Sequence, residues 1–500
     1  MFYKNLLKNK QYKYKLFNYA TFKAGVNTDL DENIIPINQS KNSYNFNYDN
    51  GALTTGMGIS PIEVHYSETS PELVKNLVAP EGVEFLGLWT YENYFSQLST
   101  KDRLLVAYGN DKKMYFNYLH YDVNYFFEIP NCTQMSEMPQ VINYYLNGQR
   151  AYLFITKSGG LQVYYNGLQQ IKTIENAPAI SSYCLHSNRM FVTDYNQPNK
   201  VWFSDESDPT NWQMGNDEAG YIELRDNRGY CLKVVSFDDY VYVFREFGIT
   251  KLSSFKNQSS ITVENMFLCN SRILADTICV CGDKVMFMTT DGLYSFNGNS
   301  TSKVELNINS WLDKVNSFSA AQFYNNCYYL SCKINFEDNE TLGCEQFKHT
   351  NNALIKIDLL NKSVSVLRGV DITYLKTLND VGFSFLCVVI NENGVHRLGM
   401  ITENGKIFDE KTKKFWRSSP YDFGMPNKKK LVKKFFINCN TDATIIFNYD
   451  GKSKQYDITA SKGNIVISPN ISAYKIGVEI LTESENCNIS SPQILVGYLW

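Results

Sequence analysis

The residues best suited to chemistry lie in the stretch NQPNKVWFSDESDPTNW, residues 196–212, where acidic side chains stand between aromatic ones. Paired carboxylates hydrolyse glycosidic bonds when they face each other across a cleft. Asp205 and Glu206 are adjacent, however, so on a strand they would point to opposite faces. Asp208-Pro209 is a turn signal, which Trp212 follows. We therefore interpret the stretch as a short strand and a turn.

A sialidase-like site is the nearest enzymatic alternative. The segment SDESDPTNW resembles the Asp-box of sialidases, but it lacks both the Asp two places after Ser204 and the turn glycine. Such a site would also need several arginines around a substrate carboxylate. The available ones precede or end strands, in positions typical of solvated side chains: Arg189, Arg245 and Arg272. A glycan-binding or glycan-cleaving protein stays open as an alternative, with Trp212 or Trp416 stacking on the sugar.

Other catalytic and metal-binding patterns are missing from the sequence. The five histidines have no metal-ligand spacing, and neither a serine nucleophile elbow nor a phosphate-binding loop occurs: His65, His120, His186, His349 and His396. Cys279 and Cys281 point to one face of a strand, but no further zinc ligands follow nearby. We predict no catalytic residue, no cofactor and no metal. The twelve cysteines lie mostly in apolar runs without an export signal, so we expect reduced thiols.

Composition favours an all-β protein. The chain has 35 Tyr and 31 Phe among 500 residues, and these side chains suit half-buried pleated surfaces. The formal net charge of -3 argues against broad binding to polyphosphates. The basic run Lys428–Lys430, continued by Lys433 and Lys434, is interpreted as a solvated strand entry. No apolar run is long enough for a membrane span.

A recurring unit positions these residues. Four strand-like runs separated by turns repeat about every 40–50 residues, which is the period of β-propeller blades. The second run of each unit is the most continuously apolar, as expected for a strand packed between neighbouring blades. We predict a propeller of about seven four-stranded blades over residues 81–412, in which KVWFSDE forms the third strand of one blade.

Segments of different character flank the propeller. Residues 413–500 alternate polar and apolar without the blade rhythm, which predicts a C-terminal β-sandwich. Residues 1–80 are polar and turn-rich, so we expect an extended N-terminal segment that wraps across the propeller or supplies a closing strand to the last blade. One helix is predicted in NINSWLDKVNSF, with Asn309 or Ser310 as N-cap. Its apolar face would be Ile308, Trp311, Leu312, Val315 and Phe318.

The order of these motifs resembles the head-completion and tail-hub (neck ring) β-propeller proteins of short-tailed bacteriophages. The likeness begins with Gly25-Val26-Asn27, Asn45-Phe46, Asp49–Leu53 and Gly56–Gly58. It continues through HSNRMFVTDYNQPNKVWFSDESDPTNW and YVYVFREFGITKL, and extends over nearly the whole chain. The residues of its hallmark blade are structural: Asn188, Arg189, Trp202, Ser204, Asp205, Asp208, Pro209 and Trp212.

The resemblance implies a structural virion protein and not an enzyme. Members of that family assemble as rings, commonly of six copies, below the portal or its adaptor and help to form the DNA exit channel. The implied partners are therefore further copies of the chain, the portal or adaptor ring and other tail proteins, with a passing contact to genomic DNA. The implied location is the neck or tail of a phage particle made in the host cytoplasm.

Overall fold

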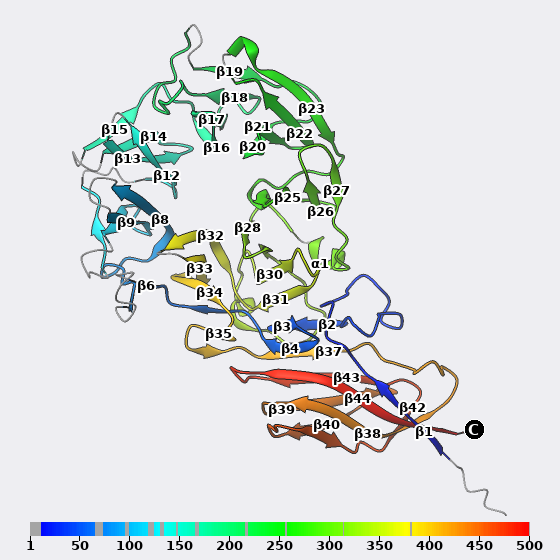
Figure 1. Ribbon diagram of the computed structural model, residues 1–500. Helices are drawn as coiled ribbons and strands as arrows, with labels where there is room; N and C mark the ends of the chain where they lie inside the picture. Colours follow the sequence, from blue (N-terminus) through cyan, green and yellow to red (C-terminus); the bar gives the residue numbers. More distant parts are fainter. Residues whose placement is uncertain are drawn as a thin grey trace, which may run out of the picture.

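The computed structural model describes residues 12–65, 74–95, 100–118, 125–130, 135–146, 149–165, 170–215, 219–255, 258–313, 315–380 and 383–499. The described chain is almost entirely strand and is arranged as a ring of sheets with a second β unit below it (Figure 1). The prediction of an all-β propeller with an extended N-terminal segment and a C-terminal β-sandwich is confirmed.

Six antiparallel four-stranded sheets follow one another along the chain, each with its strands in sequence order. The first three are β8 (Phe85–Phe95), β9 (Thr100–Gly109), β10 (Met114–Tyr118), β11 (Phe127–Glu128); β12 (Gln140–Leu146), β13 (Gln149–Thr156), β14 (Gly160–Tyr165), β15 (Gln170–Ile174); and β16 (Ile180–His186), β17 (Arg189–Asp194), β18 (Lys200–Phe203), β19 (Gly220–Glu223). The next three are β20 (Cys231–Phe237), β21 (Tyr240–Arg245), β22 (Gly248–Ser253), β23 (Thr262–Leu268); β24 (Cys279–Cys281), β25 (Lys284–Thr289), β26 (Gly292–Phe296), β27 (Thr301–Lys303); and β28 (Ala320–Tyr324), β29 (Cys327–Cys332), β30 (Ala353–Asp358), β31 (Val364–Arg368).

The seventh sheet is completed by the N-terminal segment. Its strands are β32 (Ile372–Asp380), β33 (Phe383–Glu392), β34 (Val395–Thr402), β5 (Gly58–Ser60), β35 (Lys406–Ile407) and β36 (Glu410–Lys411). Strand β5 pairs antiparallel with β34, so a segment from the start of the chain takes the fourth position of the last blade. The ring closes where β32 meets β8, because the Tyr374 hydroxyl donates a hydrogen bond to the Leu88 carbonyl at 2.5 Å.

Strand burial explains why these sequences form blades. The first strands of the sheets lie nearest the centre of the ring (Figure 1), and the second strands are the most completely buried where burial is described. All residues of β17 and of β29 are buried, as their continuous apolar character predicts. The third strand has the alternating pattern of a half-buried strand: in β18, Val201 and Phe203 are buried and Trp202 is half-buried.

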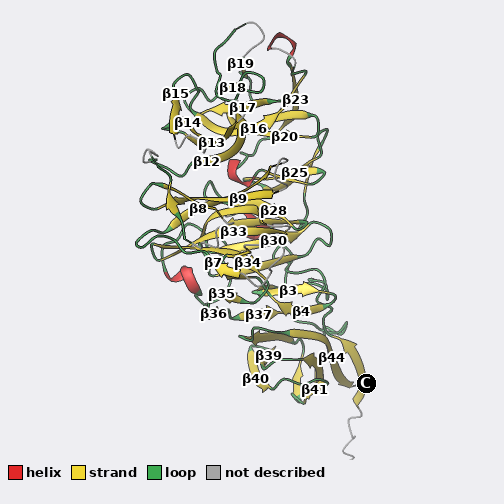
Figure 2. Ribbon diagram, turned by 60° about the vertical axis from the view of Figure 1, so that its left-hand side comes forward, coloured by secondary structure: helices red, strands yellow, loops and turns green. Residues whose placement is uncertain are grey.

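The sandwich consists of a seven-stranded and a five-stranded sheet (Figure 2). The larger sheet has the order β3 (Phe46–Asp49), β4 (Ala52–Thr55), β44 (Asn488–Leu499), β38 (Lys430–Cys439) and β41 (Asn464–Ile467), with β1 (Tyr12–Asn18) on β44 and β42 (Ile471–Ala473) on β38. The smaller sheet has the order β2 (Asn42–Tyr44), β37 (Lys414–Arg417), β43 (Gly477–Thr482), β39 (Ala443–Tyr449) and β40 (Lys452–Ile458). Apolar residues of both sheets form one core between them. A separate hairpin pairs β6 (Glu63–His65) with β7 (Val74–Asn76).

The predicted helix is shorter than its sequence suggested. Helix α1 covers only Asn309–Leu312, and Ile308 occupies the N-cap position without a side-chain cap. The prediction of Asn309 or Ser310 as N-cap is therefore wrong. Asp29, from the N-terminal segment, accepts hydrogen bonds from the Ser310 backbone and the Asn309 side chain instead. Phe318 is 68% exposed and lies outside the apolar face. Short 3-10 turns occur at Gln258–Ser260, Ala275–Thr277 and Gly343–Gln346.

Candidate functional site

The hallmark stretch follows a tight turn between the first two strands of the third sheet. Ser187 and Asn188 both have positive φ, at 47° and 60°, which is the backbone of a two-residue hairpin turn. The Asn188 carbonyl accepts a hydrogen bond from the Ser207 amide at 2.7 Å. The turn between β16 and β17 and the loop after β18 are thereby fastened to each other.

Arg189 and Ser204 connect the second and third strands beneath that loop. The Arg189 guanidinium is buried and donates to the Ser204 carbonyl at 2.9 Å, with Phe203 5.8 Å from its centre. The Ser204 hydroxyl accepts from the Met190 amide at 3.0 Å and donates to the Asp205 carbonyl at 2.9 Å. Arg189 is therefore part of the blade interior, contrary to the solvated position expected for it.

The carboxylates of the loop hold its own backbone. Asp205 accepts from the Glu206 amide at 2.7 Å and from the Asn211 side chain at 3.1 Å. Asp208 accepts from both the amide and the hydroxyl of Thr210, at 2.9 and 2.6 Å. These are Asx-turn contacts, in which a short acidic side chain replaces part of the backbone hydrogen bonding. The two carboxylates thus fix the shape of the loop.

The two tryptophans of the stretch have different surroundings. Trp212 is 3% exposed in an apolar cluster formed by the second and third sheets, and Pro209 beside it is buried. Trp202 is half-buried, donates its ring N–H to the Asp194 carboxylate at 3.0 Å and packs on Tyr221 at 4.9 Å between ring centres. The other predicted sugar-stacking residue, Trp416, is 2% exposed in the sandwich core.

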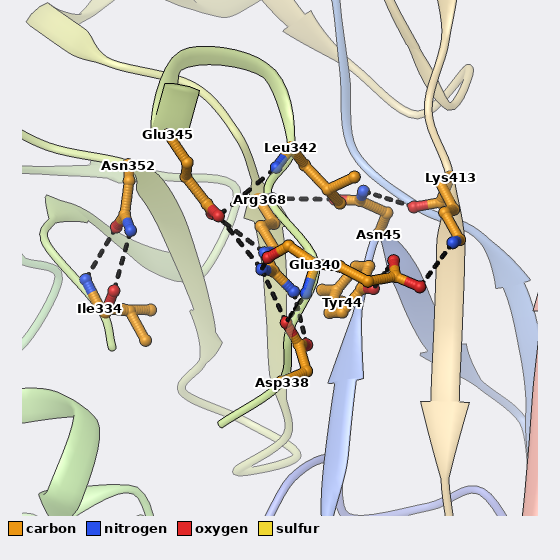
Figure 3. A network of polar contacts seen from close by, with 10 residues as sticks. All are labelled: Tyr44, Asn45, Ile334, Asp338, Glu340, Leu342, Glu345, Asn352, Arg368 and Lys413. Atoms are coloured by element: carbon orange, nitrogen blue, oxygen red, sulfur yellow. Dashed lines mark hydrogen bonds and ion pairs between the residues drawn. The ribbon is translucent and has the colours of Figure 1, made fainter. Parts of the chain in front are cut away.

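A group of buried charges lies elsewhere, at the junction of propeller and sandwich (Figure 3). The Arg368 side chain, at the end of β31, is 1% exposed. Its guanidinium donates to Asp338 at 2.7 and 3.0 Å, to Glu345 at 2.9 and 3.1 Å and to the Glu340 carbonyl at 2.6 Å. The aromatic rings of Tyr44 and Phe336 lie 4.6 and 4.1 Å from its centre.

This junction joins segments that are distant in the sequence. Asn45, between β2 and β3, accepts a hydrogen bond from the Arg368 amide at 2.8 Å and donates to the Lys413 carbonyl at 2.7 Å. The Lys413 ammonium forms an ion pair with Glu340 at 2.7 Å. The N-terminal segment, the sixth blade and the start of the sandwich therefore share one polar network.

The charges of the network are mutually compensated. Burial by itself would lower the pKa of Arg368, but hydrogen bonds and charges from Glu345 and Asp338 outweigh it and raise that pKa above its ordinary value. Burial also raises the pKa of Tyr44, and the Arg368 charge offsets this only in part. Both groups keep their ordinary charge states at neutral pH, so the network is suited to structural locking.

A cavity of about 280 Å³ lies beside the junction and holds a second buried polar group. His349 Nδ1 is 3.0 Å from the Asp371 carboxylate, and both side chains are almost fully buried. The His349 Nε2 and Asn351 Oδ1 atoms have no hydrogen-bond partner among the described residues. Sequence patterns did not indicate this pair or Arg368, because single polar residues at strand ends and in connections match no motif.

The structure also describes most of the cysteines and of the other side-chain types that could bind a metal ion. Eleven cysteines are free thiols; Cys132 and His120 lie outside the described residues. Within the described ranges, no cluster of three or more His, Cys, Asp or Glu side chains is arranged to hold a metal ion. No helix among the described residues has the length and apolar character needed to cross a membrane.

No protein-family model matches this chain, and no curated protein matches it. Solved structures are similar to its fold at low sequence identity. The N-terminal domain of Nup159 is 10% identical, with 65% of this chain and 96% of that chain covered and a TM-score of 0.35. BBS1N in complex with ARL6DN is 8% identical over 64% and 96%, with a TM-score of 0.37. The RRP9 WD40 repeats are 9% identical over 64% and 94%, also at 0.37.

Proposed function

We propose that the protein is a non-enzymatic structural component of a virion, forming a ring at the neck or tail of a short-tailed bacteriophage. The ring consists of several copies, with six as the expected number. It contacts the portal or adaptor ring and other tail proteins, and it surrounds part of the DNA exit channel. The starting point is the order of motifs from Gly25 to Trp212, which resembles the propeller proteins of that position.

The observation that carries the proposal is the way the N-terminal segment locks two β units together. Residues 12–60 add β1, β3 and β4 to one sandwich sheet, β2 to the other and β5 to the seventh propeller sheet. The Arg368 network seals the same boundary. With β5 in place the propeller is closed, so the strands β1 to β4 that join the sandwich are not needed to protect propeller edges. A rigid connection between the two units suits a protein that bears force within an assembly.

The hallmark loop supports a structural role over a glycan site. Asp205 and Asp208 are engaged in hydrogen bonds within their own loop. The rings of Trp212 and Trp416 are buried, so neither offers a face for stacking on a sugar. The same loop geometry explains the spacing of the motif without invoking a substrate.

A channel wall in this ring does not need tight phosphate binding. The formal net charge of -3 gives little general attraction to DNA, and each strong phosphate contact would slow the passage of the genome. Contact with DNA in the proposed ring is therefore transient and independent of sequence.

The deciding experiment is the protein content of purified particles. Particles of the phage whose genome encodes this chain are purified by two rounds of density-gradient centrifugation and analysed by quantitative mass spectrometry. The major capsid protein is the positive control, and a replication enzyme of the same phage is the negative control. We expect the chain in a small fixed ratio to the portal protein, and localised reconstruction of the neck should show a propeller ring. Particles that are complete and infectious without the chain would refute the proposal.

A further inference from the structure

Charge is distributed unevenly between the two β units. Residues 413–500 contain 12 Lys and Arg against 7 Asp and Glu, whereas residues 81–412 contain 28 against 37. The sandwich segment is therefore basic by five charges and the propeller segment acidic by nine. A net charge of -3 for the whole chain conceals this asymmetry.

Most of the positive charge of the sandwich segment is exposed and lacks a carboxylate partner. Seven of its lysines are exposed, and within the described residues none of them has a carboxylate at ion-pair distance: Lys428, Lys429, Lys433, Lys434, Lys452, Lys454 and Lys462. Where their ammonium groups have a partner, it is neutral. Lys433 donates to the Asn470 side chain at 3.1 Å, and Lys454 donates to the Pro469 carbonyl at 3.0 Å.

The third and fourth propeller sheets have the opposite character. Glu206, Asp238 and Asp239 are exposed, and no cation is at ion-pair distance from them among the described residues. Two cations of the same sheets are turned inward, because Arg189 is 3% and Arg245 0% exposed. Burying these arginines removes two positive charges from the outer surface of these sheets.

These two surfaces lie at opposite ends of the molecule. Strands β18 and β19 of the third sheet are at the far side of the ring from the sandwich strands β38 to β40 (Figure 1). A molecule with poles of opposite charge attracts a second copy head to tail. Contacts of this heterologous kind close into a ring when each one turns the next copy by a fixed angle.

We propose that the exposed lysines of the sandwich dock on the acidic connections of the third and fourth propeller sheets of a second copy of this chain. The inference rests on the proposed ring and names the surfaces through which the ring forms. The contact uses side chains: β40 is an edge strand, and its exposed Lys452 and Lys454 disfavour the addition of another strand. Complementary potentials of this kind guide encounter and fix orientation.

A second copy fits this surface better than DNA does. DNA would also attract lysines, but the acidic propeller of the same molecule repels it at long range. The complementary acidic surface, in contrast, is present on each copy in equal number. Binding of nucleic acid is accordingly an outcome that the experiment separates.

The test is a charge reversal with rescue. The first variant carries Lys428→Glu and Lys434→Glu, and the second carries Glu206→Lys and Asp239→Lys. Asp238 is left unchanged because its φ of 53° suits Asp better than Lys. The control carries Lys172→Glu and Lys333→Glu, two exposed lysines of the propeller. Circular dichroism melts first establish that all variants are folded, and sedimentation velocity at about 50 and about 500 mM salt measures self-association.

We expect each of the two variants to weaken self-association by about tenfold or more at low salt, and the control to leave it unchanged. Joining both sets in one chain, or mixing the two variants, should restore it because the charges are complementary again. Unchanged association in both variants, or wild-type protein that stays monomeric at low salt, overturns the inference. So does loss of binding to a duplex of about 30 base pairs in the first variant without loss of self-association. Virions that contain the chain in any of these cases leave the proposed function standing.

Discussion

Replacing Arg368 with methionine tests whether charge pairing holds the junction together. Methionine keeps most of the length and apolar volume of the side chain but removes the guanidinium. The change leaves Asp338 and Glu345, whose side chains are only 11% and 12% exposed, without their cation. Removing one partner of a buried ion pair costs about 3–5 kcal/mol, because the remaining charge stays desolvated.

The magnitude for Arg368→Met falls toward the lower end of that range. Both stranded carboxylates keep some contact with water, so we expect a loss of about 3 kcal/mol. Unfolding entropy scales at about 2.1 cal/mol/K per residue, so for a chain of 500 residues that unfolds as one unit this corresponds to about 3 °C in Tm. Hydrogen exchange should rise locally in β2 and in the connection between β29 and β30, since both contact the guanidinium through the network.

The pH dependence distinguishes stranded charge from lost packing. In Arg368→Met the two carboxylates are buried without a cation, so their pKa values rise and protonation relieves the penalty. The loss of unfolding free energy relative to wild type should therefore be largest at about pH 8 and decrease as the pH falls toward about 5. Differential scanning calorimetry at both values measures it, with Arg245→Met as matched control. Arg245 is equally buried, but its partner Asp226 is 31% exposed and is solvated after the change. A deficit for Arg368→Met that does not vary with pH would falsify the charge explanation.

Three further predictions concern blade closure, the hallmark tryptophans and the thiols. Gly58→Ala should lower stability by about 1–3 kcal/mol, because the added Cβ would lie 2.1 Å from Asn404 Oδ1 and 2.4 Å from the Lys406 carbonyl. The control is Gly463→Ala, whose added Cβ meets no atom within 4 Å. Equal melting temperatures for the two variants would contradict the role of β5. Trp212→Ala should lower the free energy of unfolding by about 3–5 kcal/mol, and Trp202→Ala should lower it by less because Trp202 is half-buried. A glycan-array signal that is lost in Trp212→Ala without a change in melting temperature would favour the glycan alternative. Burial raises the pKa of Cys327 to about 11 and of Cys332 to about 12. Both thiols therefore stay protonated up to about pH 9 and should be alkylated only on unfolding. Alkylation as fast in native as in urea-treated protein, or disulfide-linked peptides without reductant, would contradict buried, reduced thiols.

Local patterns sufficed to predict the blades but not the closure of the last one. The runs in β17 and β18 differ in apolar continuity, and that difference alone distinguishes a strand covered on both faces from one covered on one face. The pairing of β5 with β34 depends on contacts between Gly58 and Thr402, and no local signal specifies a partner at that distance. A closing strand was accordingly one of two alternatives for the N-terminal segment.

The candidate sites were predictable only where turn chemistry marks them. Asp208-Pro209 indicates its loop directly, since Asx turns depend on residues that are close in sequence. Arg368 and Arg189, in contrast, look like solvated residues at strand ends, and only their tertiary partners explain their burial. The helix was overestimated because Phe318 has the right spacing, but Asn316 and Ser319 are hydrogen-bonded to each other in a turn that contains Phe318.

The N-terminal strands have consequences for the order in which the protein is made. Thr55 bonds to Glu485, 430 positions later, and Leu53 pairs with Ile489. At about 5–20 residues per second, a ribosome needs on the order of 20–90 s to deliver those partners. During much of that interval β1, β2, β4 and β5 are outside the exit tunnel without their later partners β44, β37 and β34. Six blades can form from consecutive strands during synthesis, whereas the seventh waits for β34 and the sandwich waits for β43 and β44. A nascent chain stalled before residue 480 should therefore engage chaperones at residues 46–55, because the partner strand β44 is still missing.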